Sequence, residues 1–200
     1  LGYYLLLACS QPLYLQRHEG GLESLQKVNP DPEAEAMIAP YKKEIDAKMK
    51  EPLGNAATDM PKVRGELETI LGNFVADLVL EIARERLPEQ PIDACLLNSG
   101  GLRASIAKGP VLLEDVFSLM PFDNLVVLVQ LSEKDMMRLF DYLAEHPGTP
   151  ISGIRMEIED GNPDDMEIAG IDWEDDKEAR RPCWIVTSDF LAGGGDHMNF

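Results

Sequence analysis

Residues 98–103, Asn-Ser-Gly-Gly-Leu-Arg, have types and spacing suited to holding a polar or anionic ligand. Gly100 and Gly101 follow the apolar run 92–97, and glycine permits a positive φ and a close approach of the backbone to a ligand. Arg103 adds a planar fork of donors that fits a phosphate or a carboxylate. The same residues also suit a plain turn at the end of a strand.

Two further blocks add aromatic rings and polar groups. Residues 121–124, Pro-Phe-Asp-Asn, combine a rigid bend with an aromatic ring and an amide. Residues 190–196 open on a phenylalanine and end on an aspartate, with three glycines between them. A ring can stack on a base, and a carboxylate can accept hydrogen bonds from a ribose. The three blocks together predict a site for a base, a sugar and a phosphate, without a group placed to break a bond.

Apolar periodicity predicts the elements that position these blocks. A helix is expected over residues 66–86, because apolar side chains recur on one face at helical spacing. The sequence predicts strands at residues 92–97, 125–130, 153–158 and 184–188. Further helices are predicted from Pro32, around residues 113–118 and, after an N-cap box at Ser132, up to Glu145. Helices and strands mix without strict alternation, which predicts an α+β fold.

The charge of the chain limits its partners. The 200 residues are 44% hydrophobic, enough for one good core, and carry a formal net charge of −18. A surface of this sign repels polyanions, so we expect no nucleic-acid binding. A small phosphorylated ligand stays possible where a few arginines gather in a pocket.

The N-terminal residues resemble a lipoprotein signal. Leu6-Leu7-Ala8-Cys9 resembles a lipobox with Cys9 as the acylated residue, and the apolar stretch before it is short for a complete signal. An ordinary N-terminal strand is the alternative. We therefore expect a signal segment at residues 1–9, a polar segment at 10–31 and one domain at 32–200. The lipid anchor would be the domain's only contact with a membrane, in a bacterial cell envelope.

Two other cysteines, Cys95 and Cys183, lie in or beside apolar runs and are expected to behave as small buried hydrophobic residues. An exported location would permit a disulfide between them, but their spacing does not indicate one. No Cys-x-x-Cys pair or histidine and cysteine cluster suggests zinc.

In their order and spacing, Asn-x-Gly-Gly-x-Arg, Pro-Phe-x-Asn and Phe-x-x-x-Gly-Gly-Asp resemble the C-terminal domain of bacterial 5′-nucleotidases. Residues 62–64, Glu68, residues 71–73 and Asp77 also resemble the opening of that domain. The resemblance covers about residues 38–200, and it implies an α+β domain in which two aromatic rings sandwich the substrate base. The residues that it assigns to substrate binding are Arg64, Asn98, Gly101, Arg103, Phe122, Asn124, Gly153, Phe190 and Asp196.

Within these assignments, Phe122 and Phe190 match the stacking pair, and Arg64 and Arg103 match arginines at the substrate site. Asn124 matches an amide that contacts the base, Asp196 a carboxylate that contacts the ribose, and Gly153 a glycine near the base.

Two positions depart from the family pattern. Met60 stands where an arginine usually precedes Arg64, and Asp123 replaces a glycine beside the expected base. Both changes are expected to weaken anion binding.

Family enzymes hydrolyse phosphate esters with two metal ions held in a separate metallophosphatase domain, and this sequence has no Asp-x-His or Gly-Asn-His-Glu/Asp block for such a centre. We therefore expect no catalytic residue and no cofactor in this chain, and divalent metals only in a partner metallophosphatase subunit or domain. The chain would supply the half that binds a nucleoside or nucleotide. The alternative is an envelope lipoprotein that binds nucleosides without a catalytic partner.

Overall fold

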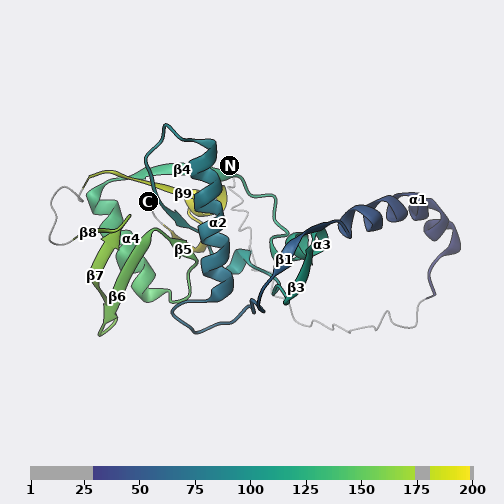
Figure 1. Cartoon of the computed structure of the whole chain (residues 1–200), viewed down its shortest axis with the longest axis horizontal. Helices are drawn as coiled ribbons and strands as arrows, with labels where there is room; N and C mark the ends of the chain where they lie inside the picture. The colour runs from purple at the N-terminus through teal and green to yellow at the C-terminus, as the bar shows by residue number, and fades with distance from the viewer. Residues whose placement is uncertain (1–28, 174–180, 199–200) are drawn as a thin grey trace, which may run out of the picture. The chain divides into compact units, whose positions relative to one another are not determined.

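The computed structural model describes residues 29–173 and 181–198 (Figure 1). The predicted acylated residue Cys9 lies outside these residues, as do the predicted signal at 1–9 and almost all of the polar segment at 10–31.

The chain divides into two units, Leu1–Lys43 and Glu44–Phe200, with the division inside helix α1 (Pro32–Met49). This is the helix predicted from Pro32, and it continues through Pro40. The elements that build the site all belong to the second unit.

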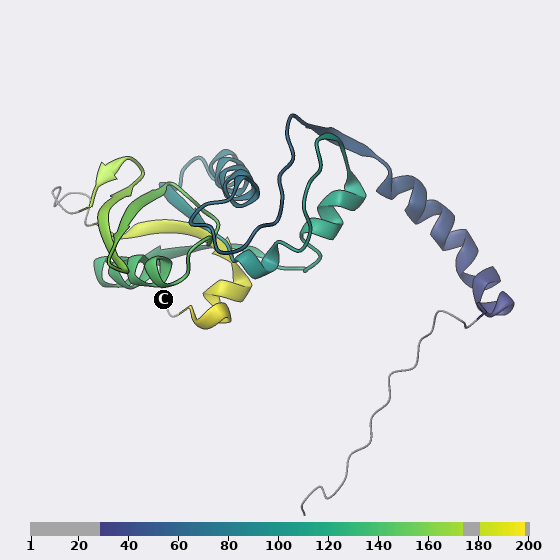
Figure 2. The ribbon, with the colours of Figure 1, turned by 90° about the horizontal axis from the view of Figure 1, so that it is seen from below.

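A four-stranded sheet forms the centre of the second unit. Its order is β4 (Val126–Leu131), β9 (Cys183–Ser188), β2 (Ile92–Leu96) and β5 (Ile151–Ser152). β2 runs parallel to β9, whereas β4 runs antiparallel to β9 and β5 antiparallel to β2. Every residue of β2 is buried, because α2 (Ile70–Arg86) covers one face of the sheet and α4 (Glu133–Glu145) the other. Figure 2 shows the blue α2 and the green α4 on opposite sides of the sheet.

The alternation of side chains along the strands separates two cores. In β2, Cys95 packs in the core on the α2 side, and Ala94 and Leu96 pack in the core on the α4 side. β9 alternates in the same way, with Val186 toward α2 and Ile185 toward α4. A strand with both faces buried has a nearly continuous apolar run, and residues 92–97 have this pattern except at Asp93, which pairs with Arg181.

N-cap side chains set the first residues of helices α4 and α2. Ser132 Oγ accepts a hydrogen bond from Asp135 N, so α4 begins where its N-cap box predicted. The helix predicted from residue 66 begins instead at Ile70, because Thr69 Oγ1 caps it by accepting from Gly72 N at 2.9 Å. Residues 66–69 keep the apolar periodicity, but Leu67 uses its carbonyl oxygen to accept from Gly148 N.

The remaining elements flank this sheet. A second sheet consists of β6 (Ile154–Glu159), β7 (Asn162–Ile168) and β8 (Ile171–Asp172), and it shares the α4 core through an edge-to-face contact of Phe140 with Trp173. β1 (Pro52–Ala56) pairs with β3 (Gly109–Leu112), which leads into α3 (Leu113–Leu119). Two short turns, η2 (Ser99–Gly101) and η3 (Gly195–His197), and the short helix α5 (Asp189–Ala192) complete the unit. The α+β prediction is confirmed.

Cys95 and Cys183 are both buried free thiols, as the apolar runs around them predicted. Burial raises the pKa of the Cys95 thiol to about 12 and that of the Cys183 thiol to about 11, so both stay protonated at neutral pH. Within residues 29–173 and 181–198, no helix is both long and apolar enough to cross a membrane.

Candidate functional site

Strand pairing brings the three predicted blocks to one edge of the central sheet. Because β2 and β9 are parallel and β4 is antiparallel to β9, the ends of β2 and β9 lie beside the beginning of β4. Asn98 follows β2, Phe190 follows β9, and Asn124 precedes β4. Blocks that are far apart in sequence therefore meet at one edge.

A pair of hydrogen bonds fixes the two aromatic blocks to each other. Leu125 N donates to Asp189 Oδ1 at 3.0 Å, and Asp189 N donates to Leu125 O at 2.8 Å. This contact holds the loop that carries Phe122 against the start of α5, which carries Phe190. Phe122 is 54% exposed and Phe190 43% exposed, so part of each ring is available for stacking.

The glycine run after Phe190 has a steric cause. A Cβ at Gly195 would lie 2.5 Å from two carbons of the Phe190 ring, and Gly194 adopts a φ of +92°. Only glycine fits beneath the ring at that distance. The turn thus returns directly under Phe190 and delivers Asp196 to the edge of the sheet.

Asp196 is held by two hydrogen bonds. Asn98 Nδ2 donates to Asp196 Oδ2 at 3.0 Å, and Tyr142 Oη donates to the Asp196 carbonyl at 3.2 Å. Burial, together with the Asp196 charge, raises the pKa of the Tyr142 phenol, so this donor stays protonated. A Cβ at Gly101 would lie 2.8 Å from Asn98 Oδ1, so a larger residue there would displace the Asn98 side chain.

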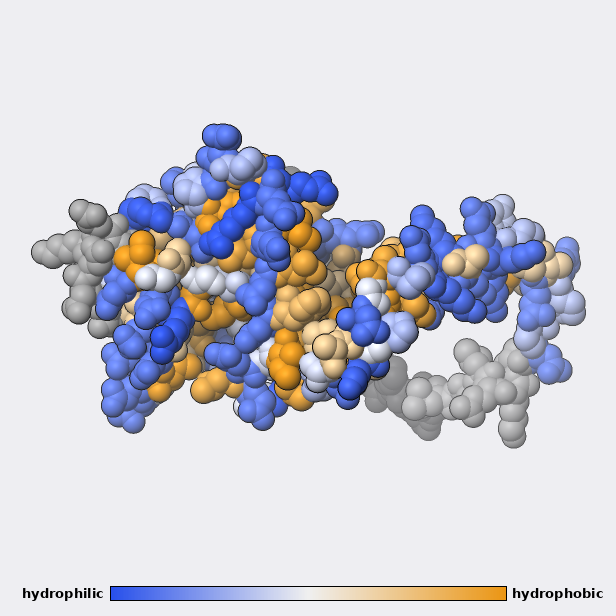
Figure 3. All heavy atoms as spheres, viewed as in Figure 1, coloured by the Kyte–Doolittle hydropathy of each residue, from blue (hydrophilic) through white to orange (hydrophobic). Residues whose placement is uncertain are grey.

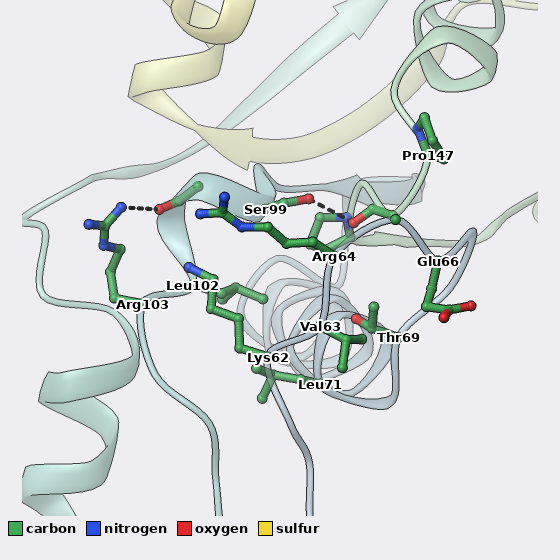
Figure 4. A pocket seen from close by; sticks show the side chains of 14 residues that line it. Lys62, Val63, Arg64, Glu66, Thr69, Leu71, Ser99, Leu102, Arg103 and Pro147 are labelled. Carbon is green, nitrogen blue, oxygen red and sulfur yellow. Dashed lines mark hydrogen bonds between the residues drawn. The ribbon is translucent and has the colours of Figure 1, made fainter.

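A cavity of about 270 Å³ lies beside η2 and is lined by three cationic side chains, Lys62, Arg64 and Arg103, and by one carboxylate, Glu66. Figure 4 shows the Lys62 and Arg64 head groups on the side of the cavity that faces Arg103. Partial burial, Arg103 and Arg64 lower the pKa of Lys62, in that order of importance. The cavity thus concentrates positive charge on a strongly acidic chain, which is the condition for binding a small anion.

Arg103 links the cavity to the first aromatic ring. Its guanidinium lies 5.9 Å from the centroid of the Phe122 ring, a cation–π distance, and its Nη1 donates to Gly100 O at 3.4 Å. A ligand that stacks on Phe122 therefore has a cationic group within reach.

Met60 stands where the family usually has an arginine, but in this structure its side chain packs in the core. Its backbone pairs with Ile106, and its side chain is 8% exposed within the α2-side core. The extended backbone after it is fixed again where Lys62 N donates to Ser105 Oγ at 2.9 Å. Lys62, which the resemblance did not assign to substrate binding, lines the cavity instead.

Gly148 is a second residue of the cavity that the sequence did not indicate. It lines the cationic cavity with a φ of +78°, and its carbonyl accepts from Ser99 Oγ at 2.7 Å. A Cβ at this position would lie 2.8 Å from Glu66 O. Its setting between Pro147 and Pro150 is a local signal of a constrained turn.

Gly153 does not line the cationic cavity. Its φ is +78°, and a Cβ there would lie 2.4 Å from Asp93 O and 3.0 Å from the Ala94 Cα. It faces a neighbouring cavity of about 560 Å³ that includes Asp77 and Ser152 and shares Pro147 and Gly148 with the cationic cavity. The structure therefore gives Gly153 a packing role against β2 and does not bring it together with the other predicted residues near the cationic cavity.

Asn124 and Asp123 are both exposed in the loop before β4, next to Phe122. Across the described ranges 29–173 and 181–198, no group of three or more His, Cys, Asp or Glu side chains is placed to hold a metal ion.

Comparison with known proteins gives this arrangement a context. The family model of the 5′-nucleotidase C-terminal domain matches residues 48–200. The chain is 28% identical over 149 residues to endonuclease YhcR of Bacillus subtilis, covering 72% of this chain and 12% of that protein. It is 28% identical over 148 residues to the 5′-nucleotidase of Vibrio cholerae, covering 72% of this chain and 25% of that protein.

Solved structures agree on the fold. The 5′-nucleotidase precursor of Thermus thermophilus superposes with a TM-score of 0.65 at 22% identity, over 82% of this chain and 34% of that one. A putative 5′-nucleotidase from Staphylococcus aureus gives a TM-score of 0.61 at 16% identity, over 85% of this chain and 36% of that one. The chain thus spans about a third or less of each of these relatives. By its match over residues 48–200, it belongs to the 5′-nucleotidase C-terminal domain family.

Proposed function

We propose that this chain binds a nucleoside monophosphate and supplies the substrate-binding half of a 5′-nucleotidase-type phosphoesterase. The observation that carries the proposal is one edge of the sheet with exposed aromatic rings, a fixed carboxylate and a three-cation cavity. Each matches one part of a nucleotide: the base, the ribose and the phosphate. The Vibrio cholerae relative, named a 5′-nucleotidase, supports the same ligand class.

The base would stack on Phe122 and Phe190, where each aromatic contact contributes ~1–3 kcal/mol. Asn124, which is exposed and close to Phe122 in sequence, would be the amide that meets the base edge. Asp196 would accept hydrogen bonds from the ribose, with its orientation set by Asn98. Lys62, Arg64 and Arg103 would hold the phosphate with charge-assisted hydrogen bonds.

Hydrolysis would require a partner metallophosphatase, as a separate subunit or as a further domain. Two metal ions there would activate water and clamp the phosphate, whereas the residues of this chain bind and orient the nucleotide. The absence of Asp-x-His and Gly-Asn-His-Glu/Asp blocks from the sequence supports this division of labour.

A nucleoside-binding role without a catalytic partner is the second candidate. Asp123 favours it, because a carboxylate next to Phe122 opposes an anionic ligand.

A lipid anchor at Cys9 in a bacterial envelope would suit either role. Mass spectrometry of the membrane fraction tests the anchor, with an acylated N-terminal Cys9 expected in the wild type and none in Cys9→Ser.

Calorimetric titration with adenosine and then AMP, without metal, tests the binding role. We expect AMP to bind at least about tenfold tighter, because each hydrogen bond to a charged group contributes ~1.5–3 kcal/mol. Equal affinities would favour the nucleoside-binding role, and absence of binding by both ligands at millimolar concentration would overturn the site. Addition of a candidate metallophosphatase with its metal then tests for AMP hydrolysis that neither protein shows alone.

A further inference from the structure

Asp189 stands at the point where strand β9 passes into helix α5. In the pairing of β4 with β9, Val126 lies opposite Ser188, so the next opposed pair in the same register is Leu125 with Asp189. Asp189 N donates to Leu125 O at 2.8 Å, as that register requires. The pairing thus continues one residue beyond the two strands.

The Asp189 carboxylate takes the place of a backbone acceptor. In an antiparallel ladder the two residues of a hydrogen-bonded pair exchange both N–H···O bonds, so Leu125 N would donate to Asp189 O. That carbonyl accepts instead from Gly193 N at 2.9 Å, because α5 has begun. Leu125 N donates to Asp189 Oδ1 at 3.0 Å. A short acceptor side chain at this position therefore keeps the second bond of the pair.

The Phe190 ring has a fixed place on one side of this contact. Phe190 follows Asp189 within α5, whose first turn is capped where Ser188 Oγ accepts from Leu191 N at 3.2 Å. The backbone at Gly195 passes beneath the ring, since a Cβ there would lie 2.5 Å from two ring carbons. The ring is therefore held in a set position relative to the Asp189 carboxylate.

The loop that carries Phe122 is anchored on the other side of the contact. It begins after Leu119, whose carbonyl accepts from Arg103 N at 2.7 Å, and it ends at Leu125. Between these anchors, the Phe122 ring centroid lies 5.9 Å from the Arg103 guanidinium. Loss of the bond to Asp189 would release one end of this loop.

Exposure alone does not distinguish the two rings. Phe74 on α2 is 43% exposed, as is Phe190, and Figure 3 shows hydrophobic and hydrophilic residues side by side over α2. Single apolar side chains scattered in this way are normal on a protein surface. Phe122 and Phe190 differ from Phe74 because one aspartate ties together the segments that carry them.

We propose that Asp189 is a positioning residue for the base, which holds the Phe122 loop and Phe190 together as one preformed stacking site. The inference rests on the proposed function, since it concerns the base that these rings would stack on. A site that is ordered before binding loses less conformational entropy when the ligand arrives, so its affinity is higher. The carboxylate acts through the rings, because its Oδ1 atom is engaged by Leu125 N.

The property that this role needs is the acceptor atom and not the charge. A carboxylate in the first turn of a helix also acts through its charge on the helix dipole. Asparagine keeps an Oδ1 acceptor without the charge, so Asp189→Asn should preserve the bond from Leu125 N, and Asp189→Ala should remove it. Both changes remove one negative charge, so the difference between them isolates the hydrogen bond.

Calorimetric titration with adenosine, without metal, tests the proposal. Asp189→Ala should weaken binding about fivefold, the lower range for a lost stacking contact, and Asp189→Asn should bind within about twofold of the wild type. Asp59→Ala is the matched control, because Asp59 Oδ1 accepts from Lys108 N at 2.7 Å in the same kind of exposed contact. The control should bind adenosine like the wild type.

A double-mutant cycle separates positioning from general stability. If Asp189 acts by holding the Phe122 loop, adding Asp189→Ala to Phe122→Ala should weaken adenosine binding by less than about a further twofold. Adding Asp189→Ala to Phe74→Ala should still give the full loss of about fivefold. A destabilised fold would give the same loss in every background, and that result would contradict the proposal.

Amide hydrogen exchange without ligand gives a readout that does not depend on binding. The Leu125 N–H should be protected in the wild type and in Asp189→Asn, and should exchange at least about tenfold faster in Asp189→Ala. Thermal melts of both variants should lie within about 4 °C of the wild type, since Asp189 is exposed.

The outcomes distinguish this proposal from the proposed function. Unchanged adenosine affinity or unchanged Leu125 exchange in Asp189→Ala would overturn the positioning role alone, as would equal losses in Asp189→Asn and Asp189→Ala. A wild type that binds neither adenosine nor AMP at millimolar concentration would overturn the proposed function, and the positioning role with it.

Discussion

The side-chain amide of Asn98 donates a 3.0 Å hydrogen bond to Asp196 Oδ2 across 98 positions of sequence. This bond connects the turn after β2 with the turn after α5, and Tyr142 Oη holds the same aspartate by its carbonyl. Asp196 itself adopts a φ of +51°, an uncommon conformation for a residue with a side chain. The neighbouring groups therefore hold Asp196 in a fixed orientation at the edge of the sheet.

Asn98→Ala should weaken adenosine binding by about tenfold. The change removes one hydrogen bond to a charged group, worth ~1.5 kcal/mol, and leaves the Asp196 carboxylate without its orienting donor. Calorimetric titration measures the effect. Asn162→Ala serves as the control, because the Asn162 amide donates to the Asp160 carbonyl in an exposed turn. Unchanged affinity in Asn98→Ala would remove Asp196 from the ribose site.

Phe122→Ala and Phe190→Ala should each weaken adenosine binding by at least about fivefold, the lower range of a lost stacking contact of ~1–3 kcal/mol. Phe122→Tyr keeps an aromatic face and should bind within about twofold of the wild type. Fluorescence or calorimetric titration measures all three. If both alanine variants bind like the wild type, the two rings do not hold the base.

Arg103→Ala should weaken AMP binding about tenfold more than adenosine binding, because the lost guanidinium faces the cavity proposed for the phosphate. Arg138→Ala is the matched control, since that arginine pairs with Asp135 on the surface of α4. Equal losses for AMP and adenosine in Arg103→Ala would instead assign Arg103 a structural role.

AMP affinity should fall as the pH rises through the pKa of Lys62. Burial and the two neighbouring arginines lower this pKa from its ordinary value of 10.5, so the ammonium loses its proton at lower pH than an exposed lysine does. The protonated form attracts the phosphate and the neutral form does not, which gives the sign. Titrations between pH 7 and the alkaline limit of folding should show the fall for AMP and not for adenosine. Lys62→Met should abolish it, and a wild-type profile in that variant would contradict the assignment.

Gly148→Ala and Gly153→Ala should separate binding from packing. Both residues have a φ of +78°, and both substitutions place a Cβ against backbone atoms, so each should cost at least about 1 kcal/mol of stability. Only Gly148→Ala alters the wall of the cationic cavity, so only it should weaken AMP binding in the folded protein. Urea denaturation and AMP titration measure the two effects. Weakened AMP binding in Gly153→Ala alone would instead support the prediction that Gly153 lies near the base.

The elements that depend on neighbouring residues could be predicted from the amino-acid sequence. Apolar spacing predicted α2 and β2, and Ser132 marked the start of α4 because an N-cap acts within one turn. The start of α2 was wrong by four residues, since apolar periodicity continues past the point where Thr69 caps the helix.

The glycine turns and exposed aromatics also indicated their chemistry, because residue type alone sets what a side chain can donate, accept or stack on. Which of those residues meet was decided by the tertiary structure. The parallel pairing of β2 with β9 and the antiparallel pairing of β4 with β9 bring the three blocks to one edge. Contacts between residues that are distant in sequence leave little trace in the local sequence. The different positions of Gly148 and Gly153 relative to the cationic cavity therefore became visible only in the tertiary structure.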